Sequence, residues 1–154
     1  KAALNPVRSQ NAGSGVLFST VAVQQGIKNH EGISAAKGGI EGLVRSASVS
    51  YARSNIRFNA VAPGMTETGL TAPLLKNEAS RAFSAGIHPL GRIGQPPEPA
   101  AVAAFLLGPQ AGWITGQVWG VDGGLGAGVS PPRARNGGDH APTERSRRWT
   151  PGPC

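Results

Sequence analysis

Cysteine, methionine and long apolar runs are nearly missing from this chain of 154 residues. The only cysteine is Cys154, so no disulfide can form within the chain, and the composition fits a reducing compartment, which we expect to be the cytoplasm. No apolar run approaches the ~20 residues that span a bilayer, so we expect no membrane association. The only methionine is Met65, and the short apolar stretch after Lys1 does not have the form of a signal peptide.

Charged residues are also scarce, at 15% of the chain, and the net charge of +7 is unevenly distributed. Residues 129–154 contain five arginines and five prolines but almost no aliphatic side chains. Such a segment cannot bury enough apolar surface to offset the ordering of its backbone. We therefore predict a domain over residues 1–128 and a disordered basic tail over residues 129–154. Out-of-frame reading of a GC-rich gene is an alternative origin for this tail.

A basic tail that contains Trp149 has the chemistry to touch nucleic acid or an acidic surface. The rest of the chain, however, carries only a modest charge excess and shows no interleaving of aromatic and basic residues. We therefore do not expect nucleic acid as a partner.

Glycine and proline are abundant, with 23 and 13 residues, and they mark turns between segments of clear periodicity. Continuous or alternating apolar residues predict strands over residues 15–20, 56–62 and 117–121. Helices are predicted over residues 30–53, 72–86 and 97–107. In the first helix, Asn29 is the predicted N-cap and Asn55 the left-handed residue at the end. Its apolar stripe consists of Ile33, Ala36, Ile40, Leu43, Val44, Ala47 and Tyr51.

Strands that alternate with helices predict right-handed crossovers and a parallel sheet, and therefore a Rossmann-like, doubly wound α/β fold. Only about three strands can be counted, and the first would be an exposed apolar edge. We therefore expect further strands upstream, so that the sheet is truncated on its N-terminal side. Ligands of such folds bind at the C-terminal ends of the strands, which here are Ser19–Thr20, Pro63–Gly64 and Asp122–Gly123.

Four blocks of the sequence occur in an order that is typical of one family. Residues 34–43 (SAAKGGIEGL) resemble the active-site helix of short-chain dehydrogenases/reductases, and residues 55–64 (NIRFNAVAPG) resemble the strand and Pro-Gly turn that follow it. Residues 91–96 and 114–124 are similar to the C-terminal segments of the family. The resemblance covers about residues 12–126, and it implies a Rossmann-fold oxidoreductase that uses NAD or NADP.

This resemblance implies roles for a lysine, a tyrosine and a serine. Lys37 matches the lysine that holds the nicotinamide ribose and lowers the pKa of the tyrosine's phenol. The tyrosine position, four residues earlier, is Ile33, which has no proton to donate. From the apolar pattern alone, Ile33 is another member of the stripe. The only tyrosine, Tyr51, lies about 21 Å beyond Lys37 along the helix, so it cannot take the place of the missing tyrosine.

The serine position, thirteen residues before Ile33, is occupied by Thr20, with Ser19 beside it. Either hydroxyl has the chemistry to bind a substrate oxygen, and the alternative is that both satisfy backbone groups at the strand end. His30 and Ser34 are the nearby groups that could replace the phenol. A solvated histidine in the first turn is the simpler interpretation of His30.

After the second strand, Pro63 and Gly64 match the turn that the family places against the nicotinamide. Thr68, with Thr66 beside it, matches a threonine that contacts the carboxamide in the family, and an ordinary polar loop is the alternative. The glycine-rich turn that carries the cofactor pyrophosphate has no match in this sequence. Three scattered histidines and one cysteine predict no metal site.

These features together predict an incomplete and inactive chain of an NAD(P)-dependent dehydrogenase/reductase that acts on a small carbonyl or alcohol substrate. The resemblance also implies a homo-oligomer, a dimer or tetramer, when the domain is complete. The alternative is a non-enzymatic fragment or pseudoenzyme that acts through oligomerisation or through binding of a partner.

Overall fold

The computed structural model describes residues 12–128, and the predicted tail lies outside the described residues. Strands β1 (Gly13–Phe18), β2 (Ile56–Pro63) and β3 (Val118–Val121) form one parallel sheet in the order β1-β2-β3. Each connection between parallel strands has to cross back along the sheet, and helices form these crossovers. The Rossmann-like α/β fold class is confirmed. Within the described residues β1 pairs only with β2, so it is an edge strand as the sequence predicts.

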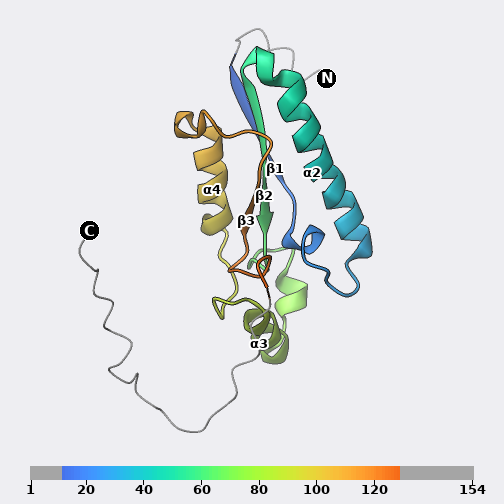
Figure 1. Cartoon of the computed structure of the whole chain (residues 1–154). Helices are drawn as coiled ribbons and strands as arrows, with labels where there is room; N and C mark the ends of the chain where they lie inside the picture. Colours follow the sequence, from blue (N-terminus) through green and yellow to red (C-terminus); the bar gives the residue numbers. More distant parts are fainter. Residues whose placement is uncertain (1–11, 129–154) are drawn as a thin grey trace, which may run out of the picture.

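Helices cover both faces of this sheet (Figure 1). Helix α2 (Glu31–Tyr51) packs on one face, and α4 (Pro97–Leu107) packs on the other. The core lies between the sheet and α4, where Val61 and Leu106 are completely buried. Helix α3 (Glu78–Ile87) lies beyond the C-terminal ends of the strands (Figure 1). No helix within residues 12–128 has the length and apolar character that a membrane span requires.

Short 3-10 turns connect these elements. They are η2 (Val21–Val23), η3 (Ala52–Ser54), η4 (Ala72–Leu75) and η5 (Pro109–Ala111). The first of them explains a difference from the predicted strand at 15–20. Strand β1 already ends at Phe18, because the Thr20 hydroxyl accepts a hydrogen bond from Ala22 N and caps η2. Ser19 and Thr20 therefore follow the strand rather than belonging to it.

The start of α2 also differs from the prediction. Its N-cap is His30, and Asn29 lies one residue outside the helix with a φ of 63°. The choice of Asn29 as N-cap is therefore wrong. Asparagine tolerates the left-handed region, so the same side chain that favours caps also favours this turn. At the other end Asn55 has a φ of 52°, which confirms its predicted conformation.

The apolar stripe of α2 is only partly buried. The buried residues of this helix are Glu41, Val44 and Ser48, whereas Ile33 is 45% and Leu43 is 52% exposed. Apolar periodicity missed the two polar members because each has a partner within the chain: the Ser19 hydroxyl for Glu41, and the Arg45 carbonyl for Ser48. A buried polar group with a hydrogen-bond partner is tolerated, and its residue type does not reveal its burial.

The helix predicted over residues 72–86 is in fact two elements, η4 and α3. The break occurs at Asn77, whose side chain accepts a hydrogen bond of 2.8 Å from Ser80 N and starts α3 as its N-cap. The helix over 97–107 is confirmed, with Pro97 in its first turn. The third strand is confirmed over four of its five predicted residues.

Candidate active site at the C-terminal ends of the strands

Lys37 reaches the end of β1 from the first half of α2. Its Nζ donates a hydrogen bond of 2.9 Å to the carbonyl oxygen of Phe18, the last residue of the strand. An ammonium group has three N–H donors, and this carbonyl uses one of them. The remaining donors suit neutral acceptors such as ribose hydroxyls, so the residue fits the sugar of a nicotinamide nucleotide.

Ser19 and Thr20 lie beside Lys37 but differ in their partners. Ser19 is buried, and its hydroxyl donates to Glu41 Oε1 at 2.8 Å. Thr20 is half-buried, and its hydroxyl oxygen accepts from Ala22 N at 3.4 Å. An accepting hydroxyl keeps its own proton for another partner. Of the two hydroxyls, the structure therefore leaves that of Thr20 better able to donate to a substrate oxygen. We call Ser19, Thr20 and Lys37 the Lys37 cluster.

Glu41 is a buried carboxylate under this cluster that the sequence analysis did not single out. It is 6% exposed, accepts from Ser19, and has Arg45 Nη1 3.8 Å from its Oε2. Its position four residues after Lys37 was the available signal, since this spacing places both residues on the same face of a helix.

Ile33, at the tyrosine position, and Ser34 and His30, the other candidates for proton transfer, lie at the start of α2. Ile33 lies on the exposed surface. The Ser34 hydroxyl donates to Ala22 O at 2.9 Å and so ties α2 to η2. His30 Nδ1 lies 2.9 Å from Lys28 O, which accepts its proton, so that Nε2 is the ring nitrogen left to take up a proton. Of these groups, His30 alone keeps a nitrogen that can exchange a proton with a ligand.

Residues 63–66 form the second part of the site, which we call the Gly64 turn. Pro63 ends β2 and pairs with Val121, and Gly64 N donates to Val121 O at 3.1 Å. The buried Thr66 donates its hydroxyl to Gly64 O at 3.2 Å. Because β1 and β2 are parallel neighbours, this turn and the Lys37 cluster lie at the same edge of the sheet.

Thr68 lies on the exposed loop beyond this turn. Its hydroxyl is 3.1 Å from that of Thr71, and its backbone N donates to the same hydroxyl at 2.9 Å. The Thr71 hydroxyl in turn donates to Thr66 O at 2.6 Å. The structure therefore connects Thr68 to the Gly64 turn through Thr71, as part of an ordered polar loop.

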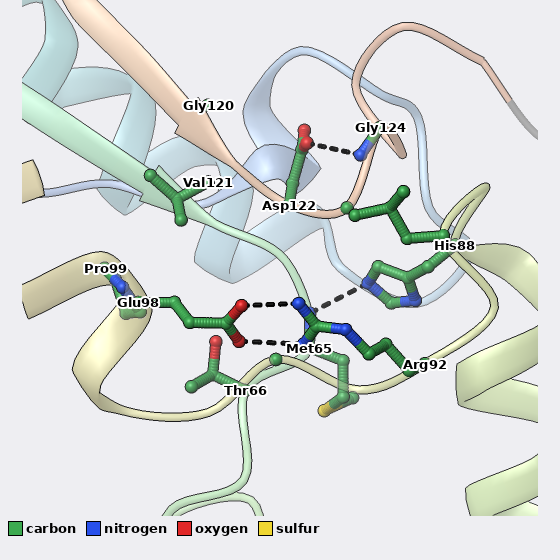
Figure 2. A pocket seen from close by; sticks show the side chains of 13 residues that line it. Met65, Thr66, His88, Arg92, Glu98, Pro99, Gly120, Val121, Asp122 and Gly124 are labelled. Atoms are coloured by element: carbon green, nitrogen blue, oxygen red, sulfur yellow. Dashed lines mark hydrogen bonds and ion pairs between the residues drawn. The ribbon is translucent and has the colours of Figure 1, made fainter. Parts of the chain in front are cut away.

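A cavity of about 280 Å³ opens beside the Gly64 turn (Figure 2). Its lining includes Met65, Thr66, His88, Arg92 and Glu98. Sequence reasoning missed His88, since a lone histidine at the end of a helix has no spacing that marks it. Of the ion pair in this cavity, Arg92 lies in the block 91–96, where the sequence pointed to the family but to no individual role, and Glu98 lies in the helix predicted over residues 97–107.

The strongest electrostatic feature of the cavity is the pair of Arg92 and Glu98 (Figure 2). The guanidinium binds both carboxylate oxygens, at 2.9 and 2.5 Å, and Gln95 N adds a hydrogen bond of 2.6 Å. The Arg92 hydrogen bonds, followed by that of Gln95, lower the pKa of Glu98 to about 2. The same pairing raises the pKa of Arg92. The carboxylate is therefore a fixed anion at neutral pH and not a proton donor.

A second exposed pair, Arg81 with Glu67, joins α3 to the loop after the Gly64 turn. The hydrogen bonds from Arg81 and from Gln95 hold the pKa of Glu67 below its usual value. Within residues 12–128, no three His, Cys, Asp or Glu residues are grouped as metal ligands would be.

Comparisons with known proteins agree with this fold. Residues 1–126 match the family model described as enoyl-(acyl carrier protein) reductase. Cyclohexanol dehydrogenase of Acinetobacter sp. (strain SE19) is 42% identical over 114 residues, which is 73% of this chain and 43% of that protein. The 3-oxoacyl-(acyl-carrier-protein) reductase FabG of Thermotoga maritima is 40% identical over 116 residues, 75% of this chain and 46% of the relative.

Among solved structures, a gluconate 5-dehydrogenase from Burkholderia cenocepacia J2315, in complex with NADP and tartrate, superposes with a TM-score of 0.79 at 28% identity. That match covers 83% of this chain and 50% of the other. The chain thus spans about half the length of the relatives it matches. Since the family model matches most of the chain, this protein belongs to the short-chain dehydrogenase/reductase family.

Proposed function

We propose that this chain supplies the nicotinamide-ribose side of an NAD(P)-dependent oxidoreductase that acts on a small carbonyl or alcohol substrate. The observation that carries the proposal is the contact of Lys37 Nζ with Phe18 O, which brings the family's lysine to the end of β1 beside Thr20. The relatives support it, since the B. cenocepacia structure is described as a complex with NADP and the Acinetobacter protein as a dehydrogenase.

In this proposal the nicotinamide, when bound, supplies hydride transfer. Lys37 binds the ribose, Thr20 donates a hydrogen bond to the substrate oxygen, and the Gly64 turn with Thr66 and Thr68 faces the carboxamide. Ser19 acts indirectly, by holding Glu41 beneath the cluster. Ile33 leaves the tyrosine's proton transfer unfilled, and this missing donor is the main defect of the site; His30 is the alternative donor that the substitution tests below address.

The residues present fit one half of the cofactor. Lys37 provides cationic donors for a ribose, and the Gly64 turn provides a surface fixed by its own hydrogen bonds for a carboxamide. Residues 12–128, however, hold no strand followed by a glycine-rich turn and a helix for the pyrophosphate. We therefore propose that residues 1–154 alone neither bind NAD(P)H tightly nor turn over substrate. Fluorescence titration with NADH and with NADPH tests this, and micromolar binding by the isolated chain would refute it.

A second candidate function follows from Ile33. An exposed apolar side chain at the position of a proton donor suits a non-enzymatic relative that acts through association with another copy of itself or with a partner. Sedimentation of the isolated chain distinguishes the candidates. A stable dimer that is abolished by Ile33→Glu, without nicotinamide binding under any condition, favours association over catalysis.

A further inference from the structure

His88 is the more deeply buried of the two histidines among the described residues, and both of its ring nitrogens have backbone partners. Figure 2 shows the bond to Met65. It is 3% exposed and follows α3 directly, as the C-cap residue. Nδ1 lies 2.6 Å from the carbonyl oxygen of Ser84, and Nε2 lies 3.1 Å from the backbone N of Met65. A carbonyl only accepts and a backbone N–H only donates, so Nδ1 carries the proton and Nε2 is the acceptor.

The ring is also packed against bare backbone. A Cβ atom on Gly64 would lie 2.7 Å from His88 Nε2 and 2.9 Å from the Cα of Asp122, so no side chain fits between them. The chain after His88 is held to the end of β3, because Leu90 N donates to Gly123 O at 3.0 Å. The imidazole therefore lies where α3, the Gly64 turn and the turn after β3 meet.

From this arrangement we propose that His88 is a positioning residue for nicotinamide binding: its Nε2 fixes the Met65 N–H and thereby orients the Gly64 turn. The inference rests on the proposed role of that turn. His88 Nε2 is the one acceptor of the Met65 N–H among the described residues, and the contact is partly buried, so loss of Nε2 leaves this donor without a protein partner. The turn then relaxes, and Thr66, whose hydroxyl is bonded to Gly64 O, moves with it.

A purely space-filling role for the ring is the competing explanation, and the hydrogen-bond chemistry separates the two. In the ¹⁵N-labelled chain, long-range ¹H–¹⁵N spectra report which ring nitrogen carries the proton. We expect the proton on Nδ1 and a scalar coupling across the hydrogen bond from Met65 N to His88 Nε2. A proton on Nε2, or no coupling, overturns the inference without any substitution.

Two variants then test the acceptor. His88→Phe keeps an aromatic ring but removes the acceptor, whereas His88→Gln keeps an acceptor oxygen on a shorter side chain. We expect the Met65 amide hydrogen to exchange about tenfold faster or more in His88→Phe, and to be substantially protected again in His88→Gln. Lys76→Ala, an exposed change just before α3, is the control and leaves this exchange unchanged. Equal exchange in all three variants contradicts a positioning role.

Nicotinamide mononucleotide is the probe that links this contact to binding, because it contains the half of the cofactor for which the chain has residues. At millimolar concentration we expect it to shift the amide signals of Met65 and Thr66 and those around Lys37. His88→Phe should abolish the first set of shifts and keep the second. If both sets of shifts persist in His88→Phe, the role of His88 is overturned and the proposed function is not. If the unsubstituted chain shows no shifts at all, the proposed function is overturned together with the role of His88.

Discussion

The Lys37 cluster and the Gly64 turn lie at the same edge of the sheet but are held in different ways. Lys37 Nζ has one hydrogen bond, to Phe18 O, and the Thr20 hydroxyl accepts a single long one of 3.4 Å. The Gly64 turn is bonded to β3 through Val121 O, to Gly94 through Met65 O, and to His88 through Met65 N. The first region thus keeps free donors, and the second has nearly all of its backbone groups paired.

The Lys37 cluster thus has donors left for a ligand, whereas the Gly64 turn, which we call the support, is held by contacts within the chain. Every hydrogen-bond partner of the Gly64 turn that lies outside the turn comes from residues that follow it in the chain. The Lys37 cluster, by contrast, lies at the C-terminal end of β1 with donors that have no partner within the described residues. Four substitutions or conditions test this division.

The largest effect is expected near the Lys37 cluster, at Ile33 on α2. We predict that Ile33→Tyr raises the reductase rate about 10²–10⁴-fold in a chain extended with the N-terminal half of the T. maritima relative, because it restores a proton donor four residues before Lys37. Ile33 is exposed, so the larger ring meets no packed neighbours. Steady-state assays with NADPH measure the rate.

Leu43→Tyr is the matched control for this change, since Leu43 is similarly exposed on the same helix but lies ten residues further on. It should leave the rate unchanged. If Ile33→Tyr gives no gain, another acid already does this work, and loss of the remaining activity in His30→Ala would identify it.

The next largest effect is expected in the assembled support. Gly64→Ala forces a Cβ to within 2.9 Å of the Asp122 backbone and 2.7 Å of the His88 ring, so we predict a loss of about 3 kcal/mol in the free energy of unfolding. Urea unfolding measures it. Gly69→Ala, whose Cβ meets nothing within 4 Å, should change this energy by less than about 1 kcal/mol. Equal effects at the two glycines would mean that the close approach does not exist.

A smaller loss is expected beneath the Lys37 cluster. Ser19→Ala removes the donor of the 2.8 Å hydrogen bond to the buried Glu41, so we predict a loss of about 1–2 kcal/mol in stability. Ser46→Ala, on the exposed face of α2, is the control. The double variant Ser19→Ala/Glu41→Leu should recover part of the loss, since it removes the stranded carboxylate. Additive losses would instead show that the two side chains act independently.

The contrast between the two regions also explains how far the sequence could predict this protein. The α/β class, the parallel order and the positions of Lys37 and Pro63 followed from periodicity and from four blocks in family order. Those signals depend on residues at fixed spacing along one element. Even the wrong N-cap, Asn29, lies one residue from the true one, His30.

The hydrogen bonds that support the two regions could not be found in this way. His88 meets Met65 across 23 residues, and Ser19 meets Glu41 across 22, so each pair exists only once the chain is folded. Each bond also depends on which atom faces which, and residue type alone does not fix that. The burial of α2 was missed for the same reason. Its buried residues include Glu41 and Ser48, whose polar side chains the apolar pattern does not assign to the core.

The smallest predicted effect is a pH dependence of the stability that the Arg92–Glu98 pair contributes. Arg92 and Gln95 N stabilise the ionised form of Glu98, whose pKa of about 2 lies below its ordinary value near 4.5. A lowered carboxyl pKa adds stability above the ordinary value, and this contribution is lost as the pH falls towards 2. Thermal unfolding of the chain and of Glu98→Gln should therefore differ at pH 6 and converge near pH 2. Because the pair is exposed, the difference should shrink in high salt. Curves that stay parallel down to pH 2 would show that Glu98 makes no charge-dependent contribution to stability.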